Sequence, residues 1–262
     1  VAGEKIYKAK SYILATGGVS HPETGSTGDG FRWLKDLGHK VLSPTPTIVP
    51  LAVSDDWIKS LAGVSMSFMK ITFYVDGVKK FMKKGKILFT HFGLSGPLIL
   101  NSAKTVADLL HTGIVTATID AFPDTDLGSL EKRIINVFDI NKNKMLKNVF
   151  DQIAPEGTSF AILSLVSVDP DKKVHSVTKE ERKEIVQILK SLPVNISGLM
   201  GFDRAVVADG GVSLDEIDTK TMRSKLYNNL YITGDLLHIN RPSGGYSLQL
   251  CWTTGYVAGE NA

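Results

Sequence analysis

The chain of 262 residues contains a single cysteine, Cys251, which excludes any disulfide bond within the chain. A chain without disulfides fits a reducing compartment, so we expect a cytoplasmic protein. No run of about 18 apolar residues occurs, so we expect no membrane-spanning helix and no membrane partner. The six histidines have no H-x-x-x-H spacing, and one cysteine offers no pair, so we expect no metal site.

Arginine is also scarce, with six Arg against 24 Lys at a formal net charge of +3. Arginine is the residue suited to bidentate recognition of phosphate and guanine, so this balance argues against sequence-specific nucleic-acid binding. We therefore expect no nucleic-acid partner. The dense basic run VKKFMKKGK, from Val78 to Lys86, alternates with apolar residues. We interpret it as the solvated face of a strand or hairpin, with a phosphate-binding patch as the alternative.

Two further features are missing from the sequence. No G-x-G-x-x-G follows a predicted strand, so the sequence lacks the pyrophosphate cradle of a nucleotide-binding fold. The opening VAGEKIYKAK has neither a starting methionine nor the character of a signal peptide, and Val1 falls within what we expect to be a hairpin strand. We therefore expect the chain to be a piece of a longer polypeptide.

What is present indicates a globular protein, since 43% of the residues are hydrophobic. The apolar stretch from Tyr12 to Ala15 ends at Thr16-Gly17-Gly18, as a buried parallel strand does at a ligand-facing turn. A helix is expected next, with Thr27 as its N-cap and Gly38 as its C-cap. The proline-rich stretch from Ser43 to Pro50 predicts a break in regular structure and a crossing between domains.

The middle of the chain changes character from β to helical. Period-two alternation around Asp76-Gly77 predicts a hairpin, and one helix is expected from Ser95-Gly96-Pro97 to about Leu110, with Ser95 as its N-cap. Helical periodicity runs from Gly128 to about Ser191. Its clearest segment, VTKEERKEIVQILKSLP, has acidic residues in its first turn and Lys190 in its last.

The predicted fold class is α/β with an insert. Both chain ends, 1–46 and 200–262, are expected to form an incomplete Rossmann-like domain. Residues 47–199 are expected to form an inserted domain, mainly β over 47–122 and mainly helical over 123–199.

Two glycine motifs near the C-terminus point to a ligand. Gly234-Asp235 follows the apolar strand LYIT, and an Asp at the carboxyl end of such a strand lies where open α/β sheets bind ligands. Ser243-Gly244-Gly245 precedes a helical repeat, so its free N–H groups lie at a helix N-terminus, which favours a negatively polarised atom. A turn that only caps a loop and an entry that only allows tight packing are the alternatives.

The ordered motifs ATGG, TGDGF, LFTHFGLSGP, GFDRAVVADGGVSLDEIDTKTMRSK and LYITGD…GGYSLQLCWTTGYVAG resemble the BaiN/YhiN-like flavoproteins. These are NAD(P)/FAD-dependent oxidoreductases with two dinucleotide-binding domains. The resemblance runs from about Tyr12 to Gly259, while the family's Gly-rich N-terminal βαβ unit is not in this chain. It implies a domain that carries FAD, with NAD(P)H as the reductant, and a middle that closes over the flavin.

The resemblance also assigns residues to the cofactor. It implies that the FAD is lined by Thr16, Gly17, Gly18, Gly234, Asp235, Gly244, Gly245, Tyr246, Ser247 and Leu248. The chain departs from the family pattern where Asp235 replaces a frequent Glu, His238 an Asp, and Ser247 an Asn. These departures leave the identity of the substrate open. Without the N-terminal unit, FAD is expected to bind this chain weakly or not at all.

Other polar residues are weaker candidates. His91 could protonate a substrate after hydride transfer, or could bond loop carbonyls. His238 and Arg241 could bind a carboxylate or an NAD(P) phosphate at the site's rim, or be ordinary charged loop residues. Cys251 is expected to be an inert packing residue of the last helix.

Three functions are therefore weighed. The first is an FAD-dependent oxidoreductase that passes hydride from NAD(P)H through the flavin to an unsaturated or carbonyl small-molecule acceptor. The second is a flavin-binding regulatory protein without turnover, and the third is an interaction module. The sequence leaves the acceptor, the choice between NADH and NADPH, and the oligomeric state unknown.

Overall fold

The structure is a computed structural model that describes residues 6–262, and it divides into two compact units. The first unit combines both chain ends, with the N-terminal part up to Val49 and the C-terminal part Met200–Ala262. The second unit is Pro50–Leu199, so the first crossing lies three residues later than the expected boundary of 46/47. The opening VAGEK, expected in a hairpin strand, lies outside the described residues.

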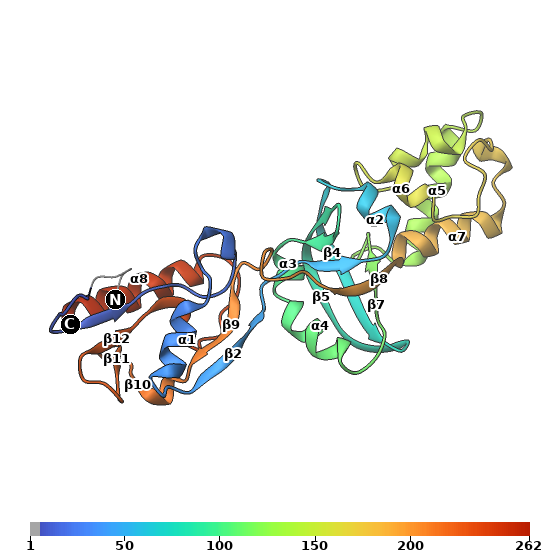
Figure 1. The fold of residues 1–262 in the computed structure, drawn as a ribbon. Coiled ribbons are helices and arrows are strands. Elements are labelled where there is room, and N and C mark those ends of the chain that lie inside the picture. Colours follow the sequence, from blue (N-terminus) through green and yellow to red (C-terminus); the bar gives the residue numbers. More distant parts are fainter. Residues whose placement is uncertain (1–5) are drawn as a thin grey trace. The chain divides into compact units, whose positions relative to one another are not determined.

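The first unit contains a four-stranded sheet in the order β1-β12-β11-β10 (Figure 1). Its outer pair, β1 (Tyr12–Leu14) and β12 (Leu230–Ile232), is parallel and joins the two ends of the chain. Short antiparallel strands continue it, β11 (Arg223–Ser224) and β10 (Ile217–Asp218). The core of the unit includes Phe31, Leu34, Val212, Ile232 and Leu236.

Helix α1 (Asp29–Asp36) differs from the prediction at both ends, since its C-cap is Leu37 and the predicted Gly38 is the residue that follows it. Its N-cap is Gly28, at φ 78°, and not Thr27, whose hydroxyl instead donates to Asp29 Oδ2 at 2.9 Å. At the other end Gly38 has φ +89°, and its N–H donates to the Lys35 carbonyl while the N–H of His39 donates to the Leu34 carbonyl. These two bonds are a Schellman motif, which glycine favours because it adopts positive φ at little cost.

The proline-rich stretch is more regular than predicted. Strand β2 (Val41–Pro46) includes Pro44 and Pro46 and pairs antiparallel with β9 (Ala208–Val212) in a separate two-stranded sheet. Prolines are tolerated because β2 has a partner on one side only and the register shifts between Leu42 and Thr45. The predicted break therefore falls after Pro46.

The second unit is built on a closed barrel of six strands, β3-β6-β5-β4-β7-β8 (Figure 1). The sequence predicted strands here but not their closure. The strands are β3 (Leu51–Val53), β4 (Ser65–Val75), β5 (Val78–Thr90), β6 (Gly93–Ser95), β7 (Val115–Asp120) and β8 (Leu192–Leu199). The predicted hairpin at Asp76-Gly77 is confirmed, and both turn residues have positive φ, 48° and 77°, as a type I′ turn requires.

The expected single helix after this hairpin is two helices, α3 (Pro97–Leu100) and α4 (Ala103–Leu110). They are separated because Ser102 bonds back through its hydroxyl to the Leu98 carbonyl at 2.7 Å. Ser95 is not an N-cap, since its backbone pairs with Leu88 within the barrel and Gly96 precedes α3.

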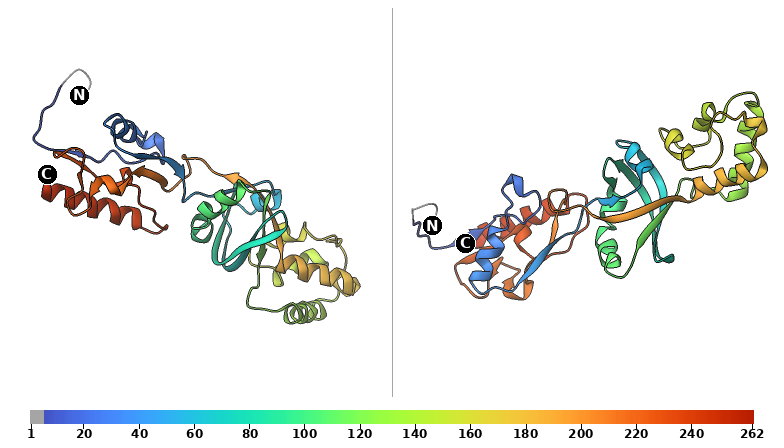
Figure 2. Two further views of the ribbon diagram at one scale, coloured as in Figure 1. Left: turned by 90° about the horizontal axis from the view of Figure 1, so that it is seen from below. Right: turned by 45° about the vertical axis from the view of Figure 1, so that its right-hand side comes forward.

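The remaining helices gather at one end of the barrel strands (Figure 2). They are α2 (Asp56–Ser60), α5 (Leu127–Ile140), α6 (Ser159–Leu163) and α7 (Lys179–Lys190), with single 3-10 turns at Leu146–Asn148, Phe150–Gln152 and Val174–Ser176. After these helices, β8 returns to the barrel and closes it between β3 and β7. Within residues 6–262, no helix is long and apolar enough to cross a membrane.

Candidate cofactor site

The parallel pairing of β1 with β12 brings the two predicted glycine turns to one edge of the sheet. Tyr12 pairs with Leu230 and Leu14 with Ile232, so both strands end at the same level. The N–H of Thr233 then donates to the Leu14 carbonyl at 3.1 Å. The carboxyl ends of parallel strands are where open α/β sheets bind ligands.

A cavity of about 190 Å³ lies at this edge. It is lined by the end of β1, the end of β12 and one face of helix α8 (Tyr246–Asn261), through Ala15 and Gly17, Gly234 and Asp235, and Cys251 and Gly255. Gly18 lies against the turn at Gly234-Asp235, because a Cβ built on it would lie 3.4 Å from the Asp235 Cβ. The structure thus brings together four of the predicted residues, 17, 18, 234 and 235.

Three glycines are required by this arrangement. Gly17 and Gly234 have φ +74° and +61°, which L side chains rarely adopt. Gly30 has a packing role instead, since its Cβ would lie 2.1 Å from Thr16 Oγ1 and 2.7 Å from Leu236 Cδ2. The TGDG motif therefore lets α1 approach the turn that follows β1.

Arg241 ties the second turn to the start of α8. Its side chain is 6% exposed, and its guanidinium donates to Asp235 Oδ1, to the Ile239 carbonyl at 2.7 Å and to Ser247 Oγ at 2.8 Å. Arginine suits this role because its planar group presents donors in several directions. Arg241 is therefore buried and holds Asp235 in place, whereas the sequence suggested an exposed rim residue.

His238 lies apart from this network. Its backbone N–H donates to the Val212 carbonyl at 2.9 Å, and its ring Nδ1 lies 3.6 Å from Asp209 Oδ1. Its side chain is partly exposed and does not line the cavity.

The start of α8 is open, as a site for a ligand edge requires. Gly245 is the N-cap at φ 83°, and a Cβ on Gly244 or Gly245 would meet nothing within 4 Å. The helical spacing of the apolar residues predicted this helix correctly. Its large apolar side chains Tyr246, Leu248, Trp252 and Tyr256 are exposed, whereas Ala258 is buried in the core of the unit.

Cys251 corrects a prediction. The residue is exposed, with its Sγ 3.2 Å from where a Gly234 Cβ would lie, so it is not a packing residue of the interior. The pKa of its thiol is raised, first by partial burial and then by the negative charge of Asp235. Since the thiolate is the reactive form, a raised pKa makes Cys251 a weak nucleophile. The sequence also missed Gly255, although Ser247, Cys251 and Gly255 recur at the i, i+4 spacing of one helix face.

His91 belongs to the second unit, in the turn between β5 and β6. It is exposed, and its ring lies edge-on to Phe92 at 4.9 Å between centroids. It does not line the cavity of the first unit, and its role in proton transfer stays a prediction.

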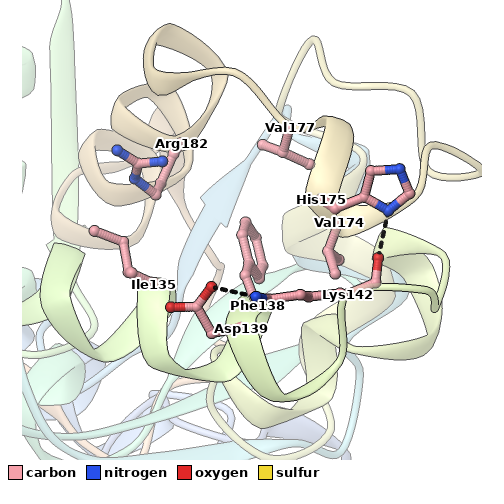
Figure 3. A pocket seen from close by; sticks show the side chains of 8 residues that line it. All are labelled: Ile135, Phe138, Asp139, Lys142, Val174, His175, Val177 and Arg182. Atoms are coloured by element: carbon pink, nitrogen blue, oxygen red, sulfur yellow. Dashed lines mark hydrogen bonds and ion pairs between the residues drawn. The ribbon is translucent and has the colours of Figure 1, made fainter.

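A second cavity, of about 320 Å³, lies among the helices of the second unit (Figure 3). Phe138 and Val177 form apolar parts of its lining, with Lys142, His175 and Arg182 around them. Three of its polar side chains already have partners. Arg182 pairs with Glu131 at 3.1 Å, Lys142 lies 3.7 Å from Asp139, and His175 Nδ1 contacts the Lys142 carbonyl at 2.7 Å. We therefore place the candidate site at the glycine turns.

Comparison with known families identifies the chain. The family model described as HI0933-like protein barrel and H2TH domain matches residues 45–207, which include the whole barrel and its helices. The chain belongs to the HI0933-like family. This confirms the resemblance to the BaiN/YhiN-like proteins.

Curated relatives of this HI0933-like chain cover nearly all of it. It is 26% identical over 98% of its length to the 3-dehydro-bile acid delta(4,6)-reductase of Clostridium scindens, covering 63% of that enzyme. It is 27% identical over 96% of its length to the ribosomal RNA dihydrouridine synthase of Haemophilus influenzae, covering 60% of it. The Escherichia coli ribosomal RNA dihydrouridine synthase is 25% identical over 95% of the chain, again with 60% covered. The chain thus spans about three fifths of the length of these relatives.

Proposed function

We propose that this chain completes the FAD site of an oxidoreductase that passes hydride from NAD(P)H, through the flavin, to an unsaturated or carbonyl acceptor. One observation carries the proposal. Gly17 and the pair Gly234-Asp235, which lie at opposite ends of the sequence, line one cavity beside helix α8, and Gly18 lies against Asp235. This is the arrangement expected where a Rossmann-like sheet formed by both chain ends meets its dinucleotide.

The residues fit part of an FAD molecule. A cavity of about 190 Å³ is smaller than the roughly 300–1,000 Å³ that encloses a whole small ligand, so it suits the ribityl chain or one ring edge. Gly17 and Gly18 allow close approach to the backbone, and Asp235 can accept hydrogen bonds from ribityl hydroxyls. The N–H groups from Gly244 to Leu248 would face the ring edge that gains negative charge on reduction. FAD itself supplies the two-electron hydride chemistry.

The names of the relatives support an unsaturated acceptor. A bile-acid reductase and a dihydrouridine synthase both add hydrogen to a ring that carries a carbonyl group. A bile acid and a ribosomal RNA differ in size and charge. We therefore propose for this chain only the chemistry that the two relatives share, and we name no particular acceptor. His91 remains the candidate proton donor to the reduced carbon. The alternative is a flavin-binding regulatory or interaction protein without turnover.

The visible spectrum of the purified full-length gene product, recorded before and after NADPH or NADH is added, tests the proposal. We expect a flavin band that the reductant bleaches and an acceptor restores. A flavin band that bleaches only slowly would favour the regulatory alternative, and absence of flavin would overturn both.

A variant pair makes the test specific to the site. Asp235→Ala should lower flavin occupancy, because it removes the ribityl acceptor and leaves buried Arg241 without its partner. Asp36→Asn, an exposed carboxylate at the end of α1, is the matched control and should keep full occupancy. Equal loss in both variants would contradict the assigned role of Asp235.

A further inference from the structure

The hairpin formed by β4 and β5 concentrates the positive charge of the chain. Residues 65–90 contain six lysines and one acidic residue, Asp76, for a formal charge of +5. The whole chain carries +3, so all other residues together sum to −2. A charge confined to one hairpin in this way creates a local field that attracts polyanions.

Several of these lysines are available to a ligand. Period-two alternation places Met82, Lys84 and Lys86 on one face of β5, while Lys80 lies at a bulge, because Phe73 pairs with Phe81 and Tyr74 with Lys79. Lys84 pairs with Asp124 at 2.8 Å, whereas no ion pair within residues 6–262 engages Lys80 or Lys86. Both free lysines are exposed.

An exposed aromatic ring lies beside one free lysine. Met66 pairs with Ile87 and Met69 with Gly85, so Ser67 and Phe68 form a bulge opposite Lys86. Phe68 is 79% exposed and has φ +60°. For a bulky residue this backbone conformation is uncommon, and here it belongs to the bulge itself.

A shallow groove of about 370 Å³ has Lys86, but not Phe68, in its lining. It runs between β5 and α3 and is lined by Lys83, Lys84, Lys86, Pro97, Leu98 and Asn101. Gly85 lets Leu98 of α3 pack closely against β5, because a Cβ there would lie 3.1 Å from Leu98 Cδ1. Exposed lysines along a groove, with an exposed ring opposite one of them, are the features that bind single-stranded nucleic acid.

We propose that this hairpin binds single-stranded RNA, with Phe68 stacked on one unpaired base and Lys80 and Lys86 in contact with phosphates. An acidic peptide would use the charge but would leave the ring without a stacking partner. An anionic lipid surface could take up both the charge and the ring, and competition by anionic vesicles distinguishes it. RNA is chosen over DNA because two relatives are named as acting on ribosomal RNA. Lysine contacts phosphate without reading bases, so the proposal replaces the expectation of no nucleic-acid partner with binding that is not sequence-specific.

The proposal does not rest on the flavin site and is tested without it, by fluorescence anisotropy of a labelled oligouridylate titrated with the protein. We expect Phe68→Asn to weaken binding by about tenfold, the order of magnitude of one base–aromatic stack. Asparagine tolerates positive φ, so this variant should fold, and circular dichroism checks that it does. Phe68→Trp should retain binding. Phe160→Ala, which removes an exposed phenylalanine from α6, should leave binding unchanged.

Salt dependence tests the lysines. Each phosphate contact on a single strand contributes about 0.7 to the slope of log K against log salt, so K80Q/K86Q should lower that slope by about 1.4. The control K132Q/K183Q removes the same charge from the exposed faces of α5 and α7 and should leave the slope unchanged.

Three results would overturn the proposal: no binding at low ionic strength, equal competition by polyglutamate or anionic vesicles, or an unchanged affinity in Phe68→Asn. Flavin occupancy, measured separately on the same samples, distinguishes this failure from failure of the proposed oxidoreductase.

Discussion

At the scale of single residues, His39 connects segments that are distant in the sequence. Its buried imidazole contacts Glu216 Oε2 at 2.8 Å through Nδ1 and the Ser224 hydroxyl at 3.0 Å through Nε2. Burial by itself would raise the pKa of Glu216, but the Lys40 N–H and His39 outweigh it, and the pKa is lowered. The glutamate therefore holds the beginning and end of the first unit together in its ionised form.

The lowered pKa predicts the pH dependence of stability. A carboxyl whose pKa is lower in the folded state contributes its full stabilisation of the folded protein above its unfolded pKa, which is about 4.3 for Glu. This stabilisation is lost as the pH falls through the lower, folded-state pKa. We expect Glu216→Gln to be less stable than the parent chain at pH 7. The difference should shrink as the pH is lowered below about 4. Urea unfolding at several pH values measures it, and a difference that grows toward acid pH would contradict the assignment.

Residue-level prediction succeeded where the signal was local. The glycines after β1 and β12 were predicted from strand endings alone. The clamp of Arg241 on Asp235 and the exposure of Cys251 were not, because they depend on how α8 docks against the sheet. Sequence spacing specified which residues share the helix face but not which way that face points.

At the scale of elements, α7 has the clearest N-terminal signal. The hydroxyl of Thr178 accepts from the Glu181 N–H at 3.2 Å, and the Glu181 carboxylate accepts from the Thr178 N–H at 2.7 Å. This capping box satisfies two backbone donors that the helix cannot. Lys172 also donates to Glu181 at 2.7 Å, fixing the loop before α7.

Removal of this cap should destabilise the second unit. We expect Thr178→Ala to cost about 1 kcal/mol of its unfolding free energy, the usual value for a lost N-cap. Chemical denaturation measures the change. Ser176→Ala, an exposed hydroxyl that caps no helix, should change stability by less than about 0.5 kcal/mol. Equal effects would show that the hydroxyl of Thr178 contributes nothing particular.

Element prediction failed where neighbours override local preference. The Asp76-Gly77 hairpin was predictable because two adjacent residues specify its turn. The sequence suggested that Ser95 is a helix N-cap, yet Ser95 belongs to strand β6 of the barrel and pairs with Leu88 of β5. Pro44 and Pro46 looked like a break, yet an edge position accommodates both. In each case the deciding partner is not an adjacent residue in the sequence.

At the scale of the whole molecule, the barrel encloses its own core. Phe73 and Phe89 are fully buried, and Phe73 stacks on Phe81 with 4.5 Å between ring centroids. Closure was not predictable, because it depends on β8 pairing with both β3 and β7 after a helical excursion. The first strand of the unit and its last are neighbours, with Leu51 opposite Leu199.

This topology predicts that residues 50–199 fold as an independent unit. We expect the excised segment to unfold cooperatively, and Phe73→Ala to destabilise it by about 3–5 kcal/mol, the range for removing a buried phenyl ring. Phe160→Ala, at an exposed position, is the control. A broad, uncooperative transition of the excised segment, followed by circular dichroism, would contradict the prediction.

The pairing of Tyr12 with Leu230 has a consequence for synthesis on the ribosome. The first strand leaves the exit tunnel long before its partner exists, and it must stay unpaired while the barrel module is translated. Because long-range pairing is slow, early folding of that module shortens the effective loop that β1 and β12 must close. The edge of the sheet at Gly17 and Gly234 therefore forms only after the barrel module, and until then β1 has no partner strand.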